Sequence, residues 1–146
     1  MSLTATIKSA VKDAMRAKDK ERLGALRLVT AEFKKVEVDE RIEVDDARAL
    51  QILDKMCKQR RDSIQQYTDA GREDLAAVEQ AEIAVISEFM PEAISEEELT
   101  KMVAEAIAQS GAAGMQDMGK VMGILKPQVQ GRADMAQVSQ MVKSQL

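Results

Sequence analysis

The residues whose types and spacing could do chemistry lie between positions 117 and 134, in the stretch DMGKVMGILKPQVQGRAD. Gly119 and Gly123 stand four residues apart, and Lys120 follows the first glycine. A phosphate-binding loop of the nucleotide type needs a glycine-rich turn after a strand, ending in Gly-Lys-Ser or Gly-Lys-Thr. Here Val121 follows Lys120 and no strand is predicted before it, so we exclude a nucleotide loop.

The same stretch reads better as a helix with two different faces. One face carries Gly119, Lys120 and Gly123, and the opposite face is apolar, with Met118, Val121, Met122 and Leu125. Two glycines leave a helix face without side-chain bulk, so another backbone can approach it closely. That backbone belongs either to a neighbouring helix of the same protein or to a ligand such as RNA, with Lys120 as the charge. The spacing alone leaves both alternatives open.

The end of the stretch suggests an anion site. Gly131 permits a tight turn, and Arg132 stands two residues before Asp134, the predicted N-cap of the last helix. A helix N-terminus beside an arginine suits a bound anion. Arg132 could equally pair with an acidic neighbour, and the spacing does not decide between the two.

A second charged constellation is predicted farther upstream, where two helices meet at a short turn around Gly71. The helices should pack antiparallel, in a register that places Ile64 opposite Val78 and Cys57 opposite Val85 on their inward faces. Arg60 and Glu82 each interrupt an apolar stripe, and the same register places them opposite one another. An unpaired charge at this depth would be costly, so we expect a semi-buried ion pair that sets the register. The alternative is a charged site between the helices.

Several residue types that catalysis often uses are absent or scarce. The chain has no histidine, which excludes a Ser-His-Asp triad, a histidine base and a histidine-ligated metal. The single cysteine, Cys57, falls on an apolar stripe and is predicted to belong to the core. The three glutamates at 96–98 are predicted to complement a helix dipole rather than to bind metal. We therefore expect no catalytic residue, metal or cofactor.

The charge distribution and the targeting signals indicate what the protein could bind and where in the cell it is expected. The formal net charge is −4, but the last 36 residues are mildly basic, with Lys120, Lys126, Arg132 and Lys143 against Asp117 and Asp134. The basic run Lys58–Arg61 is interpreted as part of a solvated helix face that Lys58 shares with Arg48 and Lys55, with a polynucleotide footprint as the alternative. The first residues lack a signal peptide's apolar core, and no stretch approaches the ~20 apolar residues of a membrane helix. With a single cysteine, this predicts a cytoplasmic protein without a membrane partner.

Good helix formers dominate the chain, and only nine residues are glycine or proline, so we expect an all-α protein. A four-helix N-terminal region is predicted for residues 1–91, and a small three-helix C-terminal domain for residues 92–146. The predicted helices are 4–18, a second that begins after Asp19 and fades in the charged stretch 36–44, 46–70, 73–89, 95–110, 117–125 and 134–146. Ser95 and Glu98 form a capping box, and Lys126-Pro127 is predicted to stop the sixth helix.

An ordered set of short motifs resembles the YqeY-like family over nearly the whole chain. The motifs are Lys58-Gln-Arg-Arg-Asp-Ser-Ile, Ala70-Gly-Arg-Glu-Asp-Leu, Phe89-Met-Pro, Asp117-Met-Gly-Lys-Val-Met-Gly and Gly131-Arg-Ala-Asp. The resemblance implies an all-α fold with long N-terminal helices and a small C-terminal helical domain. That family is similar to the tail domain of the B subunit of the tRNA-dependent amidotransferase, which converts Glu-tRNA(Gln) or Asp-tRNA(Asn) to the amide.

The resemblance implies where tRNA would be contacted. Carried over by motif, the face with Gly119, Lys120 and Gly123 and the turn at Gly131 and Arg132 would face the tRNA. Lys126 and Lys143 would add phosphate contacts. The amidotransferase tail usually has lysine where this chain has Arg132, and often proline at the position of Met135. The positive charge at position 132 is the same in both proteins, but the specific contact that the lysine makes with RNA is not transferred to Arg132.

The resemblance does not imply that this chain is catalytic, because the chain is too short to form the catalytic cradle of the amidotransferase. If a carbon–nitrogen ligase activity with glutamine as amido donor were assigned to this chain, the assignment would derive from the larger relative and not from residues of this chain. We therefore expect a non-catalytic, tRNA-binding-like helical protein, with a monomer favoured. The alternatives are an accessory that works with amidotransferase or aminoacyl-tRNA synthetase components, and a pure protein-interaction module with exposed methionines.

Overall fold

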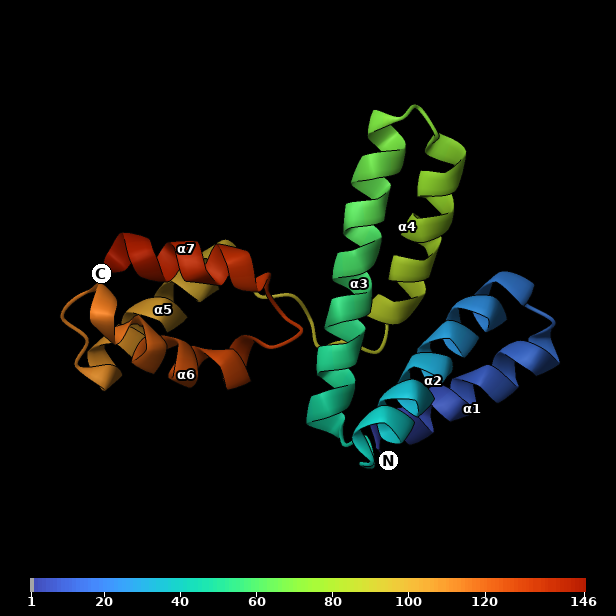
Figure 1. Ribbon diagram of the computed structural model, residues 1–146, viewed down its shortest axis with the longest axis horizontal. Helices are drawn as coiled ribbons and strands as arrows, with labels where there is room; N and C mark the ends of the chain where they lie inside the picture. Colours follow the sequence, from blue (N-terminus) through green and yellow to red (C-terminus); the bar gives the residue numbers. More distant parts are fainter. Residues whose placement is uncertain (1) are drawn as a thin grey trace. The chain divides into compact units, whose positions relative to one another are not determined.

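The computed structural model describes residues 2–146, and the regular elements in this range are all helices (Figure 1). The all-α prediction is confirmed. The α-helices in chain order are α1 (Leu3–Ala17), α2 (Lys20–Glu40), α3 (Asp46–Asp69), α4 (Glu73–Ser87), α5 (Glu96–Ser110), α6 (Met118–Val129) and α7 (Met135–Gln145). The chain divides into two compact units, Met1–Met90 and Pro91–Leu146. That these units are separate folding domains of four and three helices stays a prediction.

The N-terminal unit consists of two helical hairpins, α1 with α2 and α3 with α4 (Figure 1). Each of the first three helices begins at a residue whose side-chain oxygen accepts a backbone N–H of the first turn: Ser2, Asp19 and Asp45. The α3–α4 turn is made by Gly71 at φ 72°, a conformation that glycine adopts without strain. The fully buried side chains of this unit include Ile7, Leu26, Val29, Leu53 and Ile86.

Helix α2 is longer than the sequence predicted. The stretch 36–40, expected to fray, continues the helix to Glu40, and Arg41 ends it at φ 55°. Val36 packs against the core of the unit, and the Glu40 carboxylate lies 2.5 Å from an Arg48 guanidinium nitrogen of α3. These tertiary contacts stabilise a last turn that local charge density alone argued against.

The predicted inward face of helix α4 is confirmed at Val85, Ile86 and Phe89, which lie in or against the core, but it is wrong at Val78. Val78, expected opposite Ile64, is 56% exposed, whereas Ala76 and Ile86 are buried and Ile83 packs against the core. The inward face is therefore rotated toward Ala76, Glu79 and Ile83. Apolar residues on α4 occupy more than one face, so the stripe could not be chosen from their positions alone.

The C-terminal unit is built from α5, α6 and α7, which all pack on one another (Figure 1). The Ser95 hydroxyl accepts the backbone N–H of Glu98 at 3.2 Å, as the capping box requires, and Gly111 ends α5 at φ 70°. The core contains the buried residues Leu99, Val103, Ala106, Val121, Leu125, Val129, Val138 and Val142.

Helix α6 does not stop at Lys126-Pro127, and the predicted end of this helix is wrong. It continues to Val129, with Pro127 inside its last turn. Proline removes one backbone N–H and disfavours a helix interior, but the loss is smaller near a helix end. Leu125 and Val129 are four residues apart and both fully buried, so continuing the helix places Val129 in the core.

Candidate nucleic-acid interface

The outer face of α6 is uncovered. Gly119 and Gly123 are both exposed, and a Cβ atom added at either position would meet nothing within 4 Å. The apolar face behind them is turned inward, with Val121 and Leu125 fully buried. The packing alternative, in which a neighbouring helix of this unit lies against the glycines, is therefore wrong. The face is open to an outside molecule.

Two lysines lie on either side of the glycines. At 100° per residue, Lys120 and Lys126 stand on opposite edges of the surface that Gly119 and Gly123 leave bare. The Lys120 ammonium lies 3.8 Å from an Asp117 carboxylate oxygen, and its side chain is 72% exposed. Lys126 is exposed and forms no ion pair with any residue that the structure describes. Such an exposed pair is weak, so both ammonium groups remain available to a ligand.

Pro127 changes the backbone chemistry of this face. In a regular helix the carbonyl of Gly123 would accept the N–H of residue 127, but proline has no N–H to donate. Because Gly123 has no side chain and is exposed, its carbonyl oxygen can accept a hydrogen bond from outside the helix. The outer face of α6 therefore combines two ammonium groups with a backbone acceptor.

The Gly131–Arg132 turn has a structural role in the C-terminal unit. Gly131 has φ 75°, and the Arg132 backbone N–H donates to the carbonyl of Val129 at 2.8 Å. Its carbonyl accepts the N–H of Ile94 at 3.0 Å, and its Nε donates to the carbonyl of Glu92 at 3.2 Å. Arg132 thus ties the turn to the segment before α5 rather than pairing with an acidic side chain. The remaining guanidinium N–H groups can still reach a ligand.

The N-terminus of α7 is already occupied by a carboxylate. Asp134 is the N-cap of the helix, as predicted, and its side chain accepts the backbone N–H of Ala136 at 3.0 Å. This carboxylate stands where a bound anion would have to lie. The structure therefore argues against an anion site at the start of α7, while leaving Arg132 beside it.

Lys143 lies apart from the turn. It is exposed in the last turn of α7, about 13 Å along the helix axis from Asp134 by the rise of 1.5 Å per residue. Helices α6 and α7 are neighbours that run in opposite directions from the turn (Figure 1). The structure therefore groups Gly119, Lys120, Gly123 and Lys126 on one helix, with Arg132 and Lys143 toward opposite ends of the unit.

The expected contact between Arg60 and Glu82 is present in the α3–α4 hairpin. The Arg60 Nε lies 2.7 Å from a Glu82 carboxylate oxygen, and the side chains are 13% and 21% exposed. Glu79 approaches the same nitrogen to 3.9 Å, and Arg60 also donates to the Met56 carbonyl. The approach of Glu79 to Arg60 was not predicted from the sequence, because Val78 was assigned to the inward face of the helix. With two carboxylates and a carbonyl around it, the guanidinium is satisfied within the fold.

The other sequence candidates are structural or solvated. Lys55 and Lys58 are exposed on α3, but Arg48, expected on the same solvated face, is half-buried and paired with Glu40. Cys57 is buried, and its sulfur lies 3.8 Å from that of Met90. Burial raises the pKa of the Cys57 thiol, with Arg61 acting in the opposite direction. A protonated, buried thiol is a poor nucleophile.

Comparison with known proteins identifies the family. The model of the YqeY-like proteins matches residues 4–146. This chain belongs to the YqeY-like family. Curated relatives include altered inheritance of mitochondria protein 41 from Pyrenophora tritici-repentis, 29% identical over 87% of this chain and 71% of that protein. An uncharacterized protein of Schizosaccharomyces pombe is 29% identical over 62% of this chain and 74% of its own length.

The relatives correct one expectation about this YqeY-like chain. The Eremothecium gossypii protein, 38% identical over 59% of this chain and 48% of its own length, is also named as a mitochondrial protein 41. Because the matching proteins with a location in their names are mitochondrial, the prediction of a cytoplasmic protein is wrong. Among the helices of the described residues, none has the length and apolar character to cross a membrane.

Proposed function

We propose that this YqeY-like protein binds structured RNA, with tRNA as the first candidate, through the outer face of α6, and that it does so without catalysis. The observation that carries the proposal is the uncovered glycine face between Lys120 and Lys126. An RNA backbone offers phosphates to the two ammonium groups and 2′-hydroxyl groups to the carbonyl of Gly123, which receives no N–H from Pro127. The lack of bulk at Gly119 and Gly123 lets that backbone come close.

The composition of the surface favours recognition of shape and phosphates over recognition of bases. The described residues of the C-terminal unit contain no aromatic side chain on which a base could stack. Phosphate contacts position a protein on a nucleic acid but carry no sequence information directly. We therefore expect affinity for a folded RNA to depend on its backbone geometry and on salt.

The direct test is a tRNA-binding titration of the full chain over a series of salt concentrations. Four phosphate contacts through Lys120, Lys126, Arg132 and Lys143 predict that log K falls with log salt with a slope of about −3. The Lys120→Ala/Lys126→Ala variant should bind more weakly and lower the magnitude of that slope by about 1.5.

A matched control keeps the test specific. Lys55→Ala/Lys58→Ala removes the same charge from exposed positions on α3 and should leave tRNA affinity nearly unchanged. Arg132 is a poor first choice for alanine substitution, because its side chain holds the segment at Glu92. Absence of tRNA binding at ~50 mM salt, or equal losses in the two double variants, would rule out this function.

A protein-interaction role is the second candidate, and a specific surface favours it. A groove of about 920 Å³ between α2 and α4 is lined by Leu28 and Val78, which are 46% and 56% exposed, and by the small residues Gly24, Ala77, Ala81 and Ala84. An amphipathic helix of an amidotransferase or synthetase component would fit such a groove. Co-purification that is lost in Leu28→Gln/Val78→Gln would support this role.

A further inference from the structure

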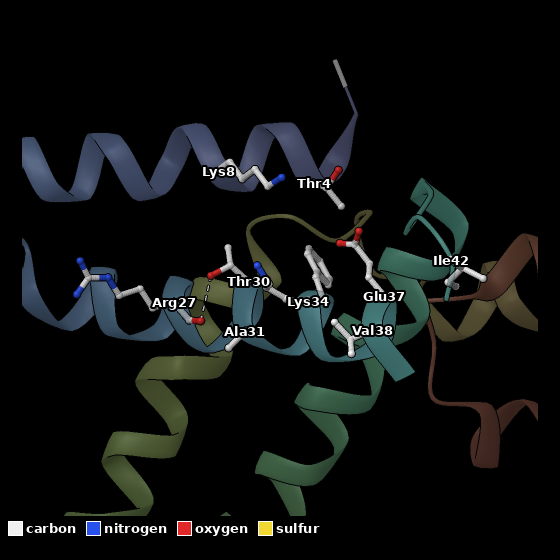
Figure 2. A pocket seen from close by; sticks show the side chains of 10 residues that line it. Thr4, Lys8, Arg27, Thr30, Ala31, Lys34, Glu37, Val38 and Ile42 are labelled. Carbon is white, nitrogen blue, oxygen red and sulfur yellow. Dashed lines mark hydrogen bonds between the residues drawn. The ribbon is translucent and has the colours of Figure 1, made fainter. Parts of the chain in front are cut away.

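A hollow between α1 and α2 gathers positive charge in a chain whose net charge is −4. It has a volume of about 690 Å³ and lies wholly within residues 4–42 (Figure 2). Lys8 of α1 and Arg27 and Lys34 of α2 line it, and Glu37 is the one carboxylate among the lining residues. The hollow therefore has an excess of two positive charges.

The charges of the three cations are not neutralised by ion pairs within residues 2–146. Lys8, Arg27 and Lys34 are exposed and form no ion pair with any described residue. Figure 2 shows Lys8 extended along α1, and the ammonium group of Lys34 on the side of α2 that faces α1. The three cations outnumber the single carboxylate of Glu37, and a bound anion would reduce the repulsion among them.

The other end of the hollow is apolar and uncovered. Val38 is 67% exposed and Ile42 is 42% exposed, while Phe33 lies buried between the helices. Most large apolar side chains of this unit lie in its core, so two exposed branched residues beside a cationic hollow are an unusual combination. The hollow thus offers an ionic part and an apolar part to one ligand.

A neighbouring hollow limits where a negative charge can lie. It has a volume of about 290 Å³, shares Thr4, Lys8 and Glu37 with the first, and adds the carboxylates Glu43 and Asp45. Asp45 caps α3 through the backbone N–H of Arg48 at 2.8 Å. An anion is therefore repelled from the end near Glu43 and drawn toward the side of Lys34 and Arg27.

We propose that the α1–α2 hollow binds an amphiphilic anion, that is, a phosphate or carboxylate head group carried on a short apolar chain. The head group lies between Lys8 and Lys34, with Arg27 at the edge, and the chain covers Val38 and Ile42. This site is separate from the RNA-binding face proposed for α6 and does not depend on it. The same chemistry is offered by a soluble alkyl phosphate and by an anionic lipid.

The first experiment is a backbone NMR titration of the full chain with n-octyl phosphate, and in parallel with inorganic phosphate. We expect saturable chemical-shift changes centred on the residues of α1 and α2 that line the hollow. Octyl phosphate should bind at least about tenfold more tightly than phosphate, because its chain removes apolar surface from water. Changes centred elsewhere, or no saturation at about millimolar ligand, would overturn the proposal.

Variants separate the two parts of the site. Lys8→Ala/Lys34→Ala should weaken both ligands at least about tenfold, since each lost cation removes a charge-assisted hydrogen bond. Val38→Gln should lower the affinity for octyl phosphate toward that for phosphate, with Ile42 still in contact with the chain, and leave phosphate binding unchanged. Lys55→Ala/Lys58→Ala, with the same charge loss on α3, should bind both ligands like the wild type. Equal weakening in the two double-lysine variants would overturn the site.

Vesicle sedimentation identifies the source of the anion. Phosphatidylglycerol vesicles are compared with phosphatidylcholine vesicles for the wild type and for Lys8→Ala/Lys34→Ala. Binding to the anionic vesicles that is lost in the variant assigns a lipid head group. A response to octyl phosphate without vesicle binding assigns a soluble ligand. Vesicle binding that the variant retains in full contradicts the proposed site.

Discussion

At the scale of single residues, the charged pair between α3 and α4 shows how a polar group is accommodated near a core. Arg60 is 13% exposed, with Glu82 at 2.7 Å and Glu79 at 3.9 Å from its Nε. A charge that loses water on folding must recover hydrogen bonds in the fold. Removing the arginine would leave two carboxylates close together, without the cation that lies between them.

Arg60→Ala should therefore lower the free energy of unfolding by about 1–3 kcal/mol. The measurement is urea unfolding followed by circular dichroism. Arg61→Ala serves as the control, because the neighbouring Arg61 is exposed and should change stability by less than about 0.5 kcal/mol. If the two variants were equally stable, the pair would contribute nothing measurable.

Cys57 predicts a pH dependence. Burial raises the pKa of its thiol above the value of about 8.5 that it has in an unfolded chain. As pH rises through 8.5, the unfolded state releases the proton while the folded state keeps it. The free energy of unfolding should then decrease between about pH 8 and pH 9.5, by at most about 1.4 kcal/mol per pH unit from this group.

The comparison variant is Cys57→Ala, which removes the titrating group. Its absolute stability should be lower, because a buried side chain is shortened. Its stability should, however, decline less steeply over the same pH range than that of the wild type. Parallel pH profiles for the two proteins would show that the thiol pKa does not differ between the folded and unfolded states.

At the scale of an element, α6 combines sequence features that lower helix stability with a position at the surface. Glycine in a helix interior lowers stability by up to about 1 kcal/mol relative to alanine, and α6 contains Gly123 in its interior, Gly119 in its first turn and an internal proline. None of the three fills space in the core. The buried apolar face therefore stabilises α6, and the outer face lacks side-chain bulk at Gly119 and Gly123.

The variant Gly119→Ala/Gly123→Ala should raise stability and lower RNA affinity. The added methyl groups meet nothing within 4 Å, so the helix should gain about 1–2 kcal/mol in total. The same methyl groups would keep an RNA backbone at a distance. Thermal unfolding and tRNA titration are measured on the same samples.

Gly24→Ala in α2 is the matched control, because that glycine also has open space around its Cβ position. It should stabilise the protein without changing tRNA affinity. A Gly119→Ala/Gly123→Ala variant that binds tRNA as tightly as the wild type would contradict the close approach of RNA to α6.

At the scale of the whole molecule, each compact unit has its own apolar core. The core of the C-terminal unit consists of eight buried side chains, all between Leu99 and Val142, and Arg132 closes the unit against the segment at Glu92. Residues 91–146 should therefore retain their helices when expressed alone. A domain of this size has marginal stability, so we expect a lower melting temperature than that of typical domains.

The fragment is tested by overlaying its amide NMR spectrum on that of the full chain. Peaks from α5, α6 and α7 should coincide, with differences near residue 91. A collapsed spectrum typical of an unfolded chain would show that the two units depend on each other. In that case the proposed division into two domains would be wrong.

The N-caps and the glycine turns could be predicted from the sequence because their determinants are local. A cap such as Ser95 bonds an N–H three residues away, and Gly71 supplies a backbone conformation at its own position. The Arg60–Glu82 pair was also accessible, because a short turn sets the register of an antiparallel hairpin. The all-α class followed from the abundance of helix-forming residues, and the resemblance carried by the motifs between Lys58 and Asp134 implied the same class.

The tertiary structure alone decided which faces are buried and how far the helices extend. Val78 is exposed, α2 continues to Glu40 and α6 passes through Pro127, because distant side chains such as Val129 gain more by burial than the local signals lose. The open space beside Gly119 and Gly123 has the same origin. Sequence spacing predicts that a face is bare, but only the positions of the other helices determine whether anything covers it.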